Sequence, residues 1–174
     1  MDYDLNKSRE ILSNTPFVLR TMLGGLSNEW LYNNEGDMTF SPFDVVGHLI
    51  LGERNDWIRR IRTIVEHGES QLFDPFDRFS MWDSNKDKEI GELLDEFETL
   101  RELNLRALDN MNLTSEDLKR TGMHPSLGVV TLGNLLATWT THDLAHISQI
   151  ARVMAKNYKD AIGPWSEFMG LVSR

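Results

Sequence analysis

The chain contains no cysteine among its 174 residues. That absence excludes disulfide bonds, cysteine-based zinc sites and a protein thiol nucleophile. The chain also lacks a run of ~18 apolar residues, the length that a membrane-spanning helix needs. Residues 1–10 are charged and contain no apolar segment of the kind found in secretory signals. We therefore expect a cytoplasmic protein that does not cross a membrane.

Positive charge is scarce as well, with 18 Lys and Arg against 27 Asp and Glu and a net charge of -9. Nucleic acids and anionic lipid surfaces both select clustered positive charge, so we expect neither as a partner. Hydrophobic residues make up 40% of the chain and charged residues 26%, which is the balance of a globular protein. The length is typical of one domain, and the sequence predicts a single domain over residues 1–174.

Glycine, proline and capping residues divide the chain into four long helices. Ser41 is a suitable N-cap before Pro42, and Gly68 is a typical C-terminal stop. Segments 68–84 and 121–130 are expected to be loops, although a strand could lie within 121–131. Long connections imply at least one crossover. The sequence predicts an all-α four-helix bundle with helices near 5–24, 42–67, 86–111 and 131–158 and a short C-terminal helix at 165–172.

One face of the fourth expected helix carries two histidines where apolar side chains would be expected. Its residues are spaced alternately four and three apart, as in the seam of a bundle helix: Leu135, Trp139, His142, His146, Gln149 and Val153. Burying two imidazoles one turn apart is costly unless a partner satisfies their nitrogens. A metal ion is one such partner, because Cβ atoms at i and i+4 are about 5–6 Å apart. A hydrogen-bonded pair or a wet pocket is the other interpretation.

His48 is the best candidate for a third metal ligand. It lies in an apolar stretch, and Gly52, one turn later, leaves room for a neighbour to approach. On a helical wheel, however, His48 lies opposite the apolar stripe of Trp57, Ile61 and Ile64 in the same expected helix. The residue pattern alone therefore leaves open whether His48 is a ligand or a packed, partly exposed histidine.

The other polar candidates have weaker signals. His67 ends a helix, where an imidazole stabilises the terminal carbonyls, and His124 lies in a loop as a surface or pocket-rim residue. Asp143 follows His142 as the glutamate of HExxH zinc proteases would, but aspartate is one methylene shorter and a bundle does not suit that enzyme class. We expect Asp143 to be a solvated helix residue, with an acceptor for a ligand histidine as the alternative. The roles of Gln149 and Glu53 stay open.

Motifs for several other reactions are missing. The sequence has no GxSxG, no glycine-rich phosphate loop and no GxGxxG. The acidic stretch 92–98 is predicted to be the solvated face of the third helix and lacks the Glu-x-x-His elements of di-iron bundles.

Four segments resemble one known family. They are Ser-Pro-Phe-Asp-Val-Val-Gly-His-Leu at 41–49 followed by Glu53-Arg54, His-Pro-Ser-Leu-Gly-Val-Val-Thr-Leu-Gly at 124–133, Thr-His-Asp-Leu-Ala-His-Ile-Ser-Gln-Ile at 141–150, and the tail 155–165. These segments resemble the DinB-like (DinB/YfiT-type) superfamily, and the resemblance extends over nearly the whole chain. The resemblance implies an up-down-down-up bundle, often homodimeric, with a divalent metal ion held by three histidines. By motif position these ligands are His48, His142 and His146.

The resemblance also implies a chemistry. Some relatives are metal-dependent transferases that activate a low-molecular-weight thiol such as bacillithiol, mycothiol or glutathione, and others are isomerases. Three histidines leave a coordination position open, as in catalytic zinc sites, and a thiol bound there would lose its proton. We therefore predict a metal-dependent transferase that activates the thiol for attack on an electrophile. The bound divalent metal is expected to be Zn or Ni. The alternatives are a non-enzymatic, stress-associated metal-binding bundle and a metal-dependent hydrolase whose general base would be Asp143 or Glu53.

Overall fold

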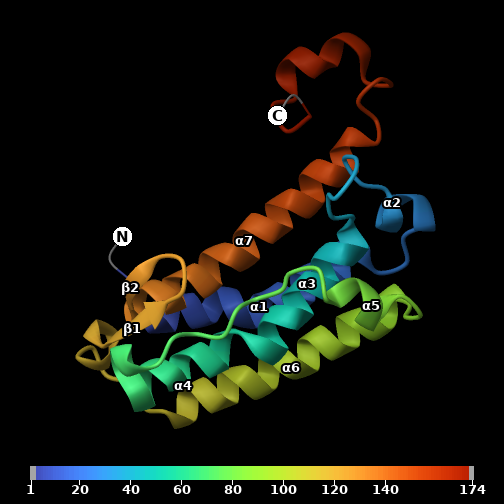
Figure 1. The fold of residues 1–174 in the computed structure, drawn as a ribbon. Helices are drawn as coiled ribbons and strands as arrows, with labels where there is room; N and C mark the ends of the chain where they lie inside the picture. Colours follow the sequence, from blue (N-terminus) through green and yellow to red (C-terminus); the bar gives the residue numbers. More distant parts are fainter. Residues whose placement is uncertain (1–2, 173–174) are drawn as a thin grey trace.

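Four long helical rods form the molecule in the computed structural model, which describes residues 3–172 (Figure 1). They are α1 (Leu5–Leu23), the pair α3 (Pro42–Asn55) and α4 (Trp57–His67), α6 (Ile90–Asn110) and α7 (Leu132–Lys156). The first and last rods run in one direction, and α3–α4 and α6 run in the other (Figure 1). The predicted all-α, up-down-down-up four-helix bundle is therefore confirmed. No helix within residues 3–172 is long and apolar enough to cross a membrane.

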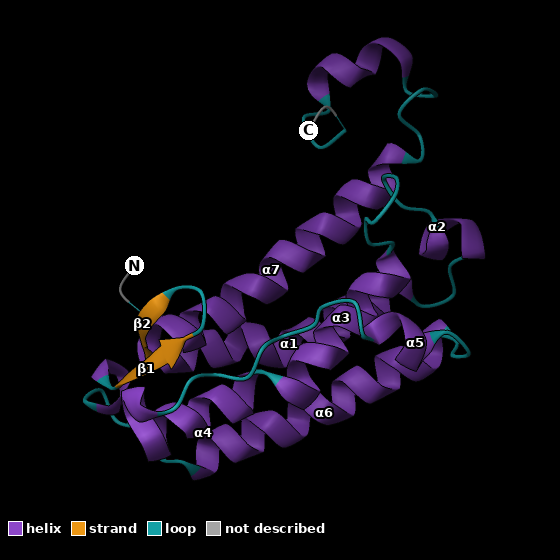
Figure 2. Ribbon diagram, viewed as in Figure 1, coloured by secondary structure: helices purple, strands orange, loops and turns teal. Residues whose placement is uncertain are grey.

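Short elements fill the connections. Two short α-helices, α2 (Asn28–Tyr32) and α5 (Met81–Asn85), and two 3-10 helices, η1 (Gly68–Ser70) and η2 (Asp117–Lys119), lie between the rods. The segment expected as the loop 121–130 is an antiparallel hairpin of β1 (Thr121–His124) and β2 (Gly128–Thr131), so the strand alternative is correct (Figure 2). Thr121 pairs with Thr131, and His124 pairs with Gly128.

The predicted short C-terminal helix is present, but its bounds differ from the expected 165–172. It is a 3-10 helix, η3 (Gly163–Phe168), none of whose residues is buried. Short helices are marginal without tertiary packing. An exposed six-residue segment therefore lacks the contacts that would hold it as a regular α-helix.

Capping boxes fix the first residues of the two helices that carry the candidate histidines. At α3, Ser41 Oγ accepts the backbone N–H of Asp44 at 3.2 Å, and the Asp44 carboxylate accepts the N–H of Ser41 at 2.9 Å. At α7, Thr131 and Asn134 make the same reciprocal pair, with both distances 3.0 Å. Each box satisfies backbone donors that a helix start leaves free. The caps therefore set where α3 and α7 begin and which faces they present.

The helix predicted over 42–67 is divided at Asp56, whose φ and ψ are -118° and -73°. The next residue, Trp57, starts α4 and stacks on Trp139 of α7 with ring centroids 5.7 Å apart. The neighbour for which Gly52 makes room is this same indole, because a Cβ at position 52 would lie 3.0 Å from Trp57 Nε1. A helical wheel assumes one continuous helix, so it could not relate the direction of His48 to the stripe on α4.

The apolar core consists of two clusters along the bundle. One includes Leu51 and Phe97, and the other includes Trp57, Leu105 and Trp139. Along each of three helices, one buried polar residue comes between the residues of the two clusters. These residues are Glu53 on α3, Arg101 on α6 and Asp143 on α7. The candidate histidines are on the same two helices, α3 and α7, as the two carboxylates among these residues.

Candidate metal centre

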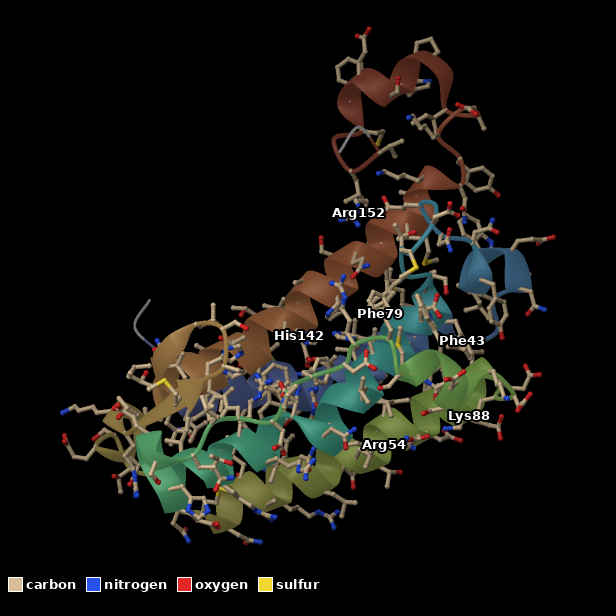
Figure 3. All side chains as sticks on the ribbon, in the orientation of Figure 1. Phe43, Arg54, Phe79, Lys88, His142 and Arg152 are labelled. Carbon is tan, nitrogen blue, oxygen red and sulfur yellow. The ribbon has the colours of Figure 1, made fainter. Side chains whose placement is uncertain are left out.

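Three histidines from two helices converge inside the bundle. His48 comes from α3, and His142 and His146 come from successive turns of α7, where Figure 3 labels His142 near the middle of the helix. The Nε2 atom of His142 lies 3.1 Å from the Nε2 atoms of both His48 and His146. One ligand atom from each residue lies within 4.8 Å of the others. The structure therefore brings together all three residues that the sequence singled out.

The geometry and the proton positions fit a metal ion. Two nitrogens bound to one ion at ~2.0–2.1 Å in a tetrahedral arrangement lie roughly 3.3 Å apart, which is close to the observed separations. His146 Nδ1 lies 2.8 Å from Gln149 Oε1. An amide oxygen only accepts, so Nδ1 carries the proton and Nε2 presents its lone pair. Gln149 thus orients one of the three rings.

Burial keeps the three imidazoles neutral. It lowers the pKa of His48 to about 4 and that of His142 to about 3, with His146 adding to both shifts. The pKa of His146 is lowered too, by burial, against the opposing hydrogen bond from Gln149. At neutral pH all three rings therefore keep a lone pair, which a metal ligand needs.

A cavity of about 370 Å³ opens beside His48 and His142. Its walls are largely apolar and include Trp57, Phe73, Phe76, Leu127, Val130 and Leu135. Its polar lining residues are Asp56, Arg60, Arg78, His124, Asn134 and Thr138. An apolar cavity with a few polar groups is typical of small-molecule sites. A small ligand could therefore reach the triad from this side.

The two remaining histidines lie away from the triad's centre. His124 lines the cavity, and its Nδ1 accepts the N–H groups of Ser126 at 3.1 Å and Leu127 at 3.2 Å, so it is a rim residue held in the hairpin turn. His67 is half exposed at the end of α4, with Nε2 3.8 Å from the Glu66 carboxylate. The structure thus resolves the choice for His124 and keeps His67 outside the site.

Asp143 is buried, so the expectation that it is a solvated residue was wrong. Its two carboxylate oxygens accept from Arg101 of α6, at 2.6 and 3.0 Å, and both side chains are at most 1% exposed. Consecutive residues of a helix point about 100° apart, so Asp143 lies on another side of α7 than His142. That side of α7 is covered by α1, whose Leu12 carbonyl also accepts from Arg101 at 2.8 Å.

Glu53 belongs to the same buried ion cluster. Its carboxylate accepts from Arg101 at 2.8 Å, from Trp139 Nε1 at 3.0 Å and from Asn104 Nδ2 at 2.9 Å. Neither Glu53 nor Asp143 lines the cavity. Both carboxylates have their oxygens occupied, so neither is available as the general base that a hydrolase would need.

Sequence reasoning missed most of the polar residues that line the cavity, among them Asp56 and Arg78. Asp56 is buried with its carboxylate 2.6 Å from Arg60 Nε, and burial raises its pKa to about 6 against the opposing charge of Arg60. The helix break at Asp56 places this residue at the cavity, and no local sequence signal marks that break. Arg78 comes from the connection between α4 and α6. A loop can be predicted there, but its path across the bundle cannot.

Comparisons with known proteins agree with this fold. The family model described as the DinB superfamily matches residues 12–150. Comparison with curated protein sequences finds no match. Among solved structures, YfiT from Bacillus subtilis matches with a TM-score of 0.74 and 21% sequence identity, covering 87% of this chain and 86% of YfiT. YfiT is described as a probable metal-dependent hydrolase with an unusual four-helix bundle topology.

Proposed function

This chain belongs to the DinB superfamily, and from that premise we propose that it is a divalent-metal-dependent enzyme with His48, His142 and His146 as the metal ligands. We further propose that it is a transferase, which activates a low-molecular-weight thiol for attack on a small electrophile. The observation that carries this proposal is the convergence of three neutral imidazoles beside a largely apolar cavity.

Three nitrogen ligands suit a catalytic site because they leave a coordination position for another ligand. A divalent ion bound there would act as a Lewis acid and lower the pKa of a thiol or a water molecule. His48, His142 and His146 would hold the ion, while Gln149 keeps the His146 ring in the required tautomer. The largely apolar walls of the cavity would pack against the electrophile.

A thiol fits the site better than water does. A thiol has an ordinary pKa of ~8.5, so it needs a small shift to ionise at neutral pH, whereas bulk water has a pKa of ~15.7 and profits from a general base. Glu53 and Asp143 are held by Arg101 and cannot supply that base. The chain has no cysteine, so the thiol must be a cosubstrate.

The overall reaction balances simply. The thiol loses its S–H proton to solvent, the sulfur electron pair forms the new S–C bond, and the leaving group departs with the electron pair of its bond to carbon. No oxidant or reductant is required.

A hydrolase is the second candidate, and Asp56 is the observation that favours it. A buried carboxyl group with a pKa of about 6 can accept a proton near neutral pH, and Asp56 lines the same cavity as His48 and His142. Replacing Asp56 with asparagine would then abolish hydrolysis, whereas it would leave thiol conjugation largely intact.

Metal content provides the first test. Purified protein is stripped with a chelator, reloaded separately with zinc and with nickel, desalted and measured by elemental analysis. We expect one ion per chain in the wild type and none in His146→Ala, with the helical circular dichroism signal retained. His67→Ala, a histidine outside the site, is the matched control and should bind like the wild type. Stoichiometric metal in His146→Ala would refute the ligand assignment.

Activity provides the second test. Reloaded protein is given a panel of thiols with a fluorogenic electrophile, with and without chelator. Metal-dependent conjugation that His146→Ala lacks would support the transferase. Metal-dependent ester or amide hydrolysis lost in Asp56→Asn would support the hydrolase instead. Bound metal without either activity would favour a non-enzymatic metal-binding bundle.

A further inference from the structure

Besides one carboxylate and two guanidinium groups, the cavity has three polar residues in its lining: His124, Asn134 and Thr138. The proposed metal centre uses none of them. His124 is the last residue of β1 in the hairpin (Figure 2), and Asn134 and Thr138 lie one turn apart in α7. An imidazole, an amide and a hydroxyl can each donate or accept a hydrogen bond. The bonds that they make within the chain therefore decide which role each side chain has left for a ligand.

The hairpin turn fixes the tautomer of His124. Its Nδ1 atom accepts the N–H groups of Ser126 and Leu127, at 3.1 and 3.2 Å. A backbone N–H only donates, so Nδ1 holds the lone pair and Nε2 carries the proton of the neutral ring. Burial lowers the pKa of His124, with a smaller contribution from the charge of Arg60, so the ring stays neutral at pH 7. The Nε2–H group has no hydrogen-bond partner within residues 3–172, and His124 thus offers a donor to a ligand.

His146 has the opposite tautomer. It carries its proton on Nδ1, which donates to Gln149 Oε1, and it presents the lone pair of Nε2 to the triad. A metal ligand needs such a lone pair. His124 has none to give, because the backbone occupies its Nδ1 and a proton occupies its Nε2. His124 is therefore suited to contact a substrate and not to bind the metal ion.

Asn134 is left with donors as well. Its Oδ1 accepts the N–H of Thr131 at 3.0 Å in the capping box of α7, and its Nδ2 has no hydrogen-bond partner in the part of the chain that the structure describes. Thr138 has the reverse property, because its hydroxyl donates to the backbone carbonyl of Asn134 at 2.7 Å and can then only accept. Two unpartnered N–H donors, on His124 and Asn134, therefore line the cavity.

We propose that His124 and Asn134 make this cavity selective for an electrophile that carries a carbonyl oxygen, to which the Nε2–H group of His124 donates. The inference rests on the proposed function and names the class of its second substrate. A carbonyl oxygen accepts hydrogen bonds and has none to donate, so it complements unpartnered N–H groups. A site that hydrogen-bonds one group of its substrate rejects the analogue without that group, because the polar atoms of the site are then left unpaired.

Two unreactive ligands test the proposal by binding alone. Acetophenone and α-methylstyrene have the same shape and differ only in the oxygen or CH2 group double-bonded to one carbon. Their Kd values for zinc-loaded protein are measured by NMR titration. In His124→Asn the amide oxygen can still accept the N–H groups of the turn, but the donor at the Nε2 position is lost. We expect the Kd of acetophenone to rise about fivefold, the equivalent of one neutral hydrogen bond, and that of α-methylstyrene to stay unchanged.

His67→Asn is the matched control, because it makes the same substitution at a half-exposed histidine that does not line the cavity. It should change neither Kd. Amide hydrogen exchange at Ser126 and Leu127 shows that the hairpin turn is intact in His124→Asn. A merely structural role for His124 would weaken the binding of both ligands alike. Equal increases in the two Kd values, or no increase for acetophenone, would overturn the proposal.

Nitrogen chemical shifts test the tautomer directly in the wild type. Protein labelled with nitrogen-15 in its histidines distinguishes protonated from unprotonated ring nitrogens, and the signals that disappear in His124→Asn belong to His124. We expect a protonated Nε2 and an unprotonated Nδ1 at pH 7. A proton on Nδ1 would overturn the proposal, even if His124→Asn failed to fold.

Kinetics separate the failure of this inference from the failure of the proposed function. Phenacyl chloride has a carbonyl next to its reacting carbon and benzyl chloride has none. Each would lose chloride, with the electron pair of the C–Cl bond, as the sulfur of 2-mercaptoethanol forms the S–C bond. A KM that rises in His124→Asn for phenacyl chloride alone would support both proposals. Acetophenone binding that depends on His124, without conjugation of either chloride, would uphold the carbonyl site and refute the transferase. Conjugation of phenacyl chloride with the same KM in the wild type and His124→Asn would refute the carbonyl site alone.

Discussion

Two polar clusters lie next to each other on the same helices, and their hydrogen bonds differ in kind. The Arg101 cluster comprises Arg101, Glu53 and Asp143, and within it every carboxylate oxygen accepts a hydrogen bond. The histidine triad has no comparable set of partners. The Nδ1 atoms of His48 and His142 are buried without a hydrogen bond, and the three Nε2 atoms point at one another.

The difference separates a structural cluster from a binding site. Buried polar groups that satisfy one another hold the chain together, whereas buried groups that lack partners indicate something from outside the chain. The Arg101 cluster also contains two carboxylates against one guanidinium. The cluster acts on the triad electrostatically, with opposite signs at two of its rings. The charge of Asp143 raises the pKa of His146, whereas the charge of Arg101 lowers that of His142.

The largest expected effect comes from removing the cation of the structural cluster. Arg101→Met leaves Glu53 and Asp143 buried without their counter-charge, and breaking a buried ion pair in this way costs about 3–5 kcal/mol. We expect the free energy of unfolding, measured by urea denaturation, to fall by that amount.

Arg106→Met is the control for that variant, since Arg106 is on the same helix and makes an exposed ion pair with Glu102. Its loss should be well under ~1 kcal/mol. A similarly small loss for Arg101→Met would show that the Arg101 cluster contributes no more to stability than a surface pair.

Metal addition should have the next largest effect, and it acts on the other cluster. Zinc at one hundred times its Kd is expected to raise the free energy of unfolding by about 2.7 kcal/mol, because it binds the folded state. Urea denaturation with and without zinc measures the change. His146→Ala should lose the increase entirely and His67→Ala should keep it. An undiminished increase in His146→Ala would move the metal site away from the triad.

Local signals account for what the sequence could predict. Ser41 and Thr131 cap their helices through residues three positions away, so the starts of α3 and α7 are visible in the sequence. The four-residue spacing of His142 and His146 is likewise a property of one helix, and it predicts that both rings share a face.

Tertiary contacts account for what the sequence could not predict. The break at Asp56 accompanies the stacking of Trp57 on Trp139, a contact between helices far apart in the chain. The burial of Asp143 depends on how many neighbours cover α7, which periodicity does not count. The direction of the His48 side chain depends on the helix break at Asp56, which the sequence pattern did not predict. Only the family resemblance therefore assigned His48 to the triad.

A smaller effect is expected at a third polar group, the ion pairs of Glu35 with Arg152 and Lys156. The Glu35 carboxylate oxygens are paired, as those of the Arg101 cluster are, but this group is partly exposed. Glu35→Gln should lower the free energy of unfolding by about 1 kcal/mol at pH 7. The folded-state pKa of Glu35 is lowered from 4.5 to about 2, so this stabilisation is present above pH 4.5 and is lost as the pH falls toward 2. Denaturation of both proteins between pH 7 and pH 3 measures the loss, with the exposed Glu102→Gln as control. A difference that does not shrink below pH 4.5 would contradict the ion-pair interpretation.

The smallest effect is expected when a histidine of the triad is replaced with an apolar residue. The same kind of replacement at Arg101 should lower the free energy of unfolding strongly, so this variant distinguishes the two clusters. His142→Leu replaces a buried imidazole, whose Nδ1 has no partner, with an apolar side chain beside Trp57. Replacing an unsatisfied polar group with an apolar one is close to neutral or stabilising, so we expect a change within ~1 kcal/mol in the presence of chelator. Urea denaturation in chelator and in zinc measures it, and the variant should not respond to zinc. A loss of several kcal/mol in chelator would mean that the chain itself satisfies the imidazole, in which case the triad would be a structural cluster of the same kind as the one at Arg101.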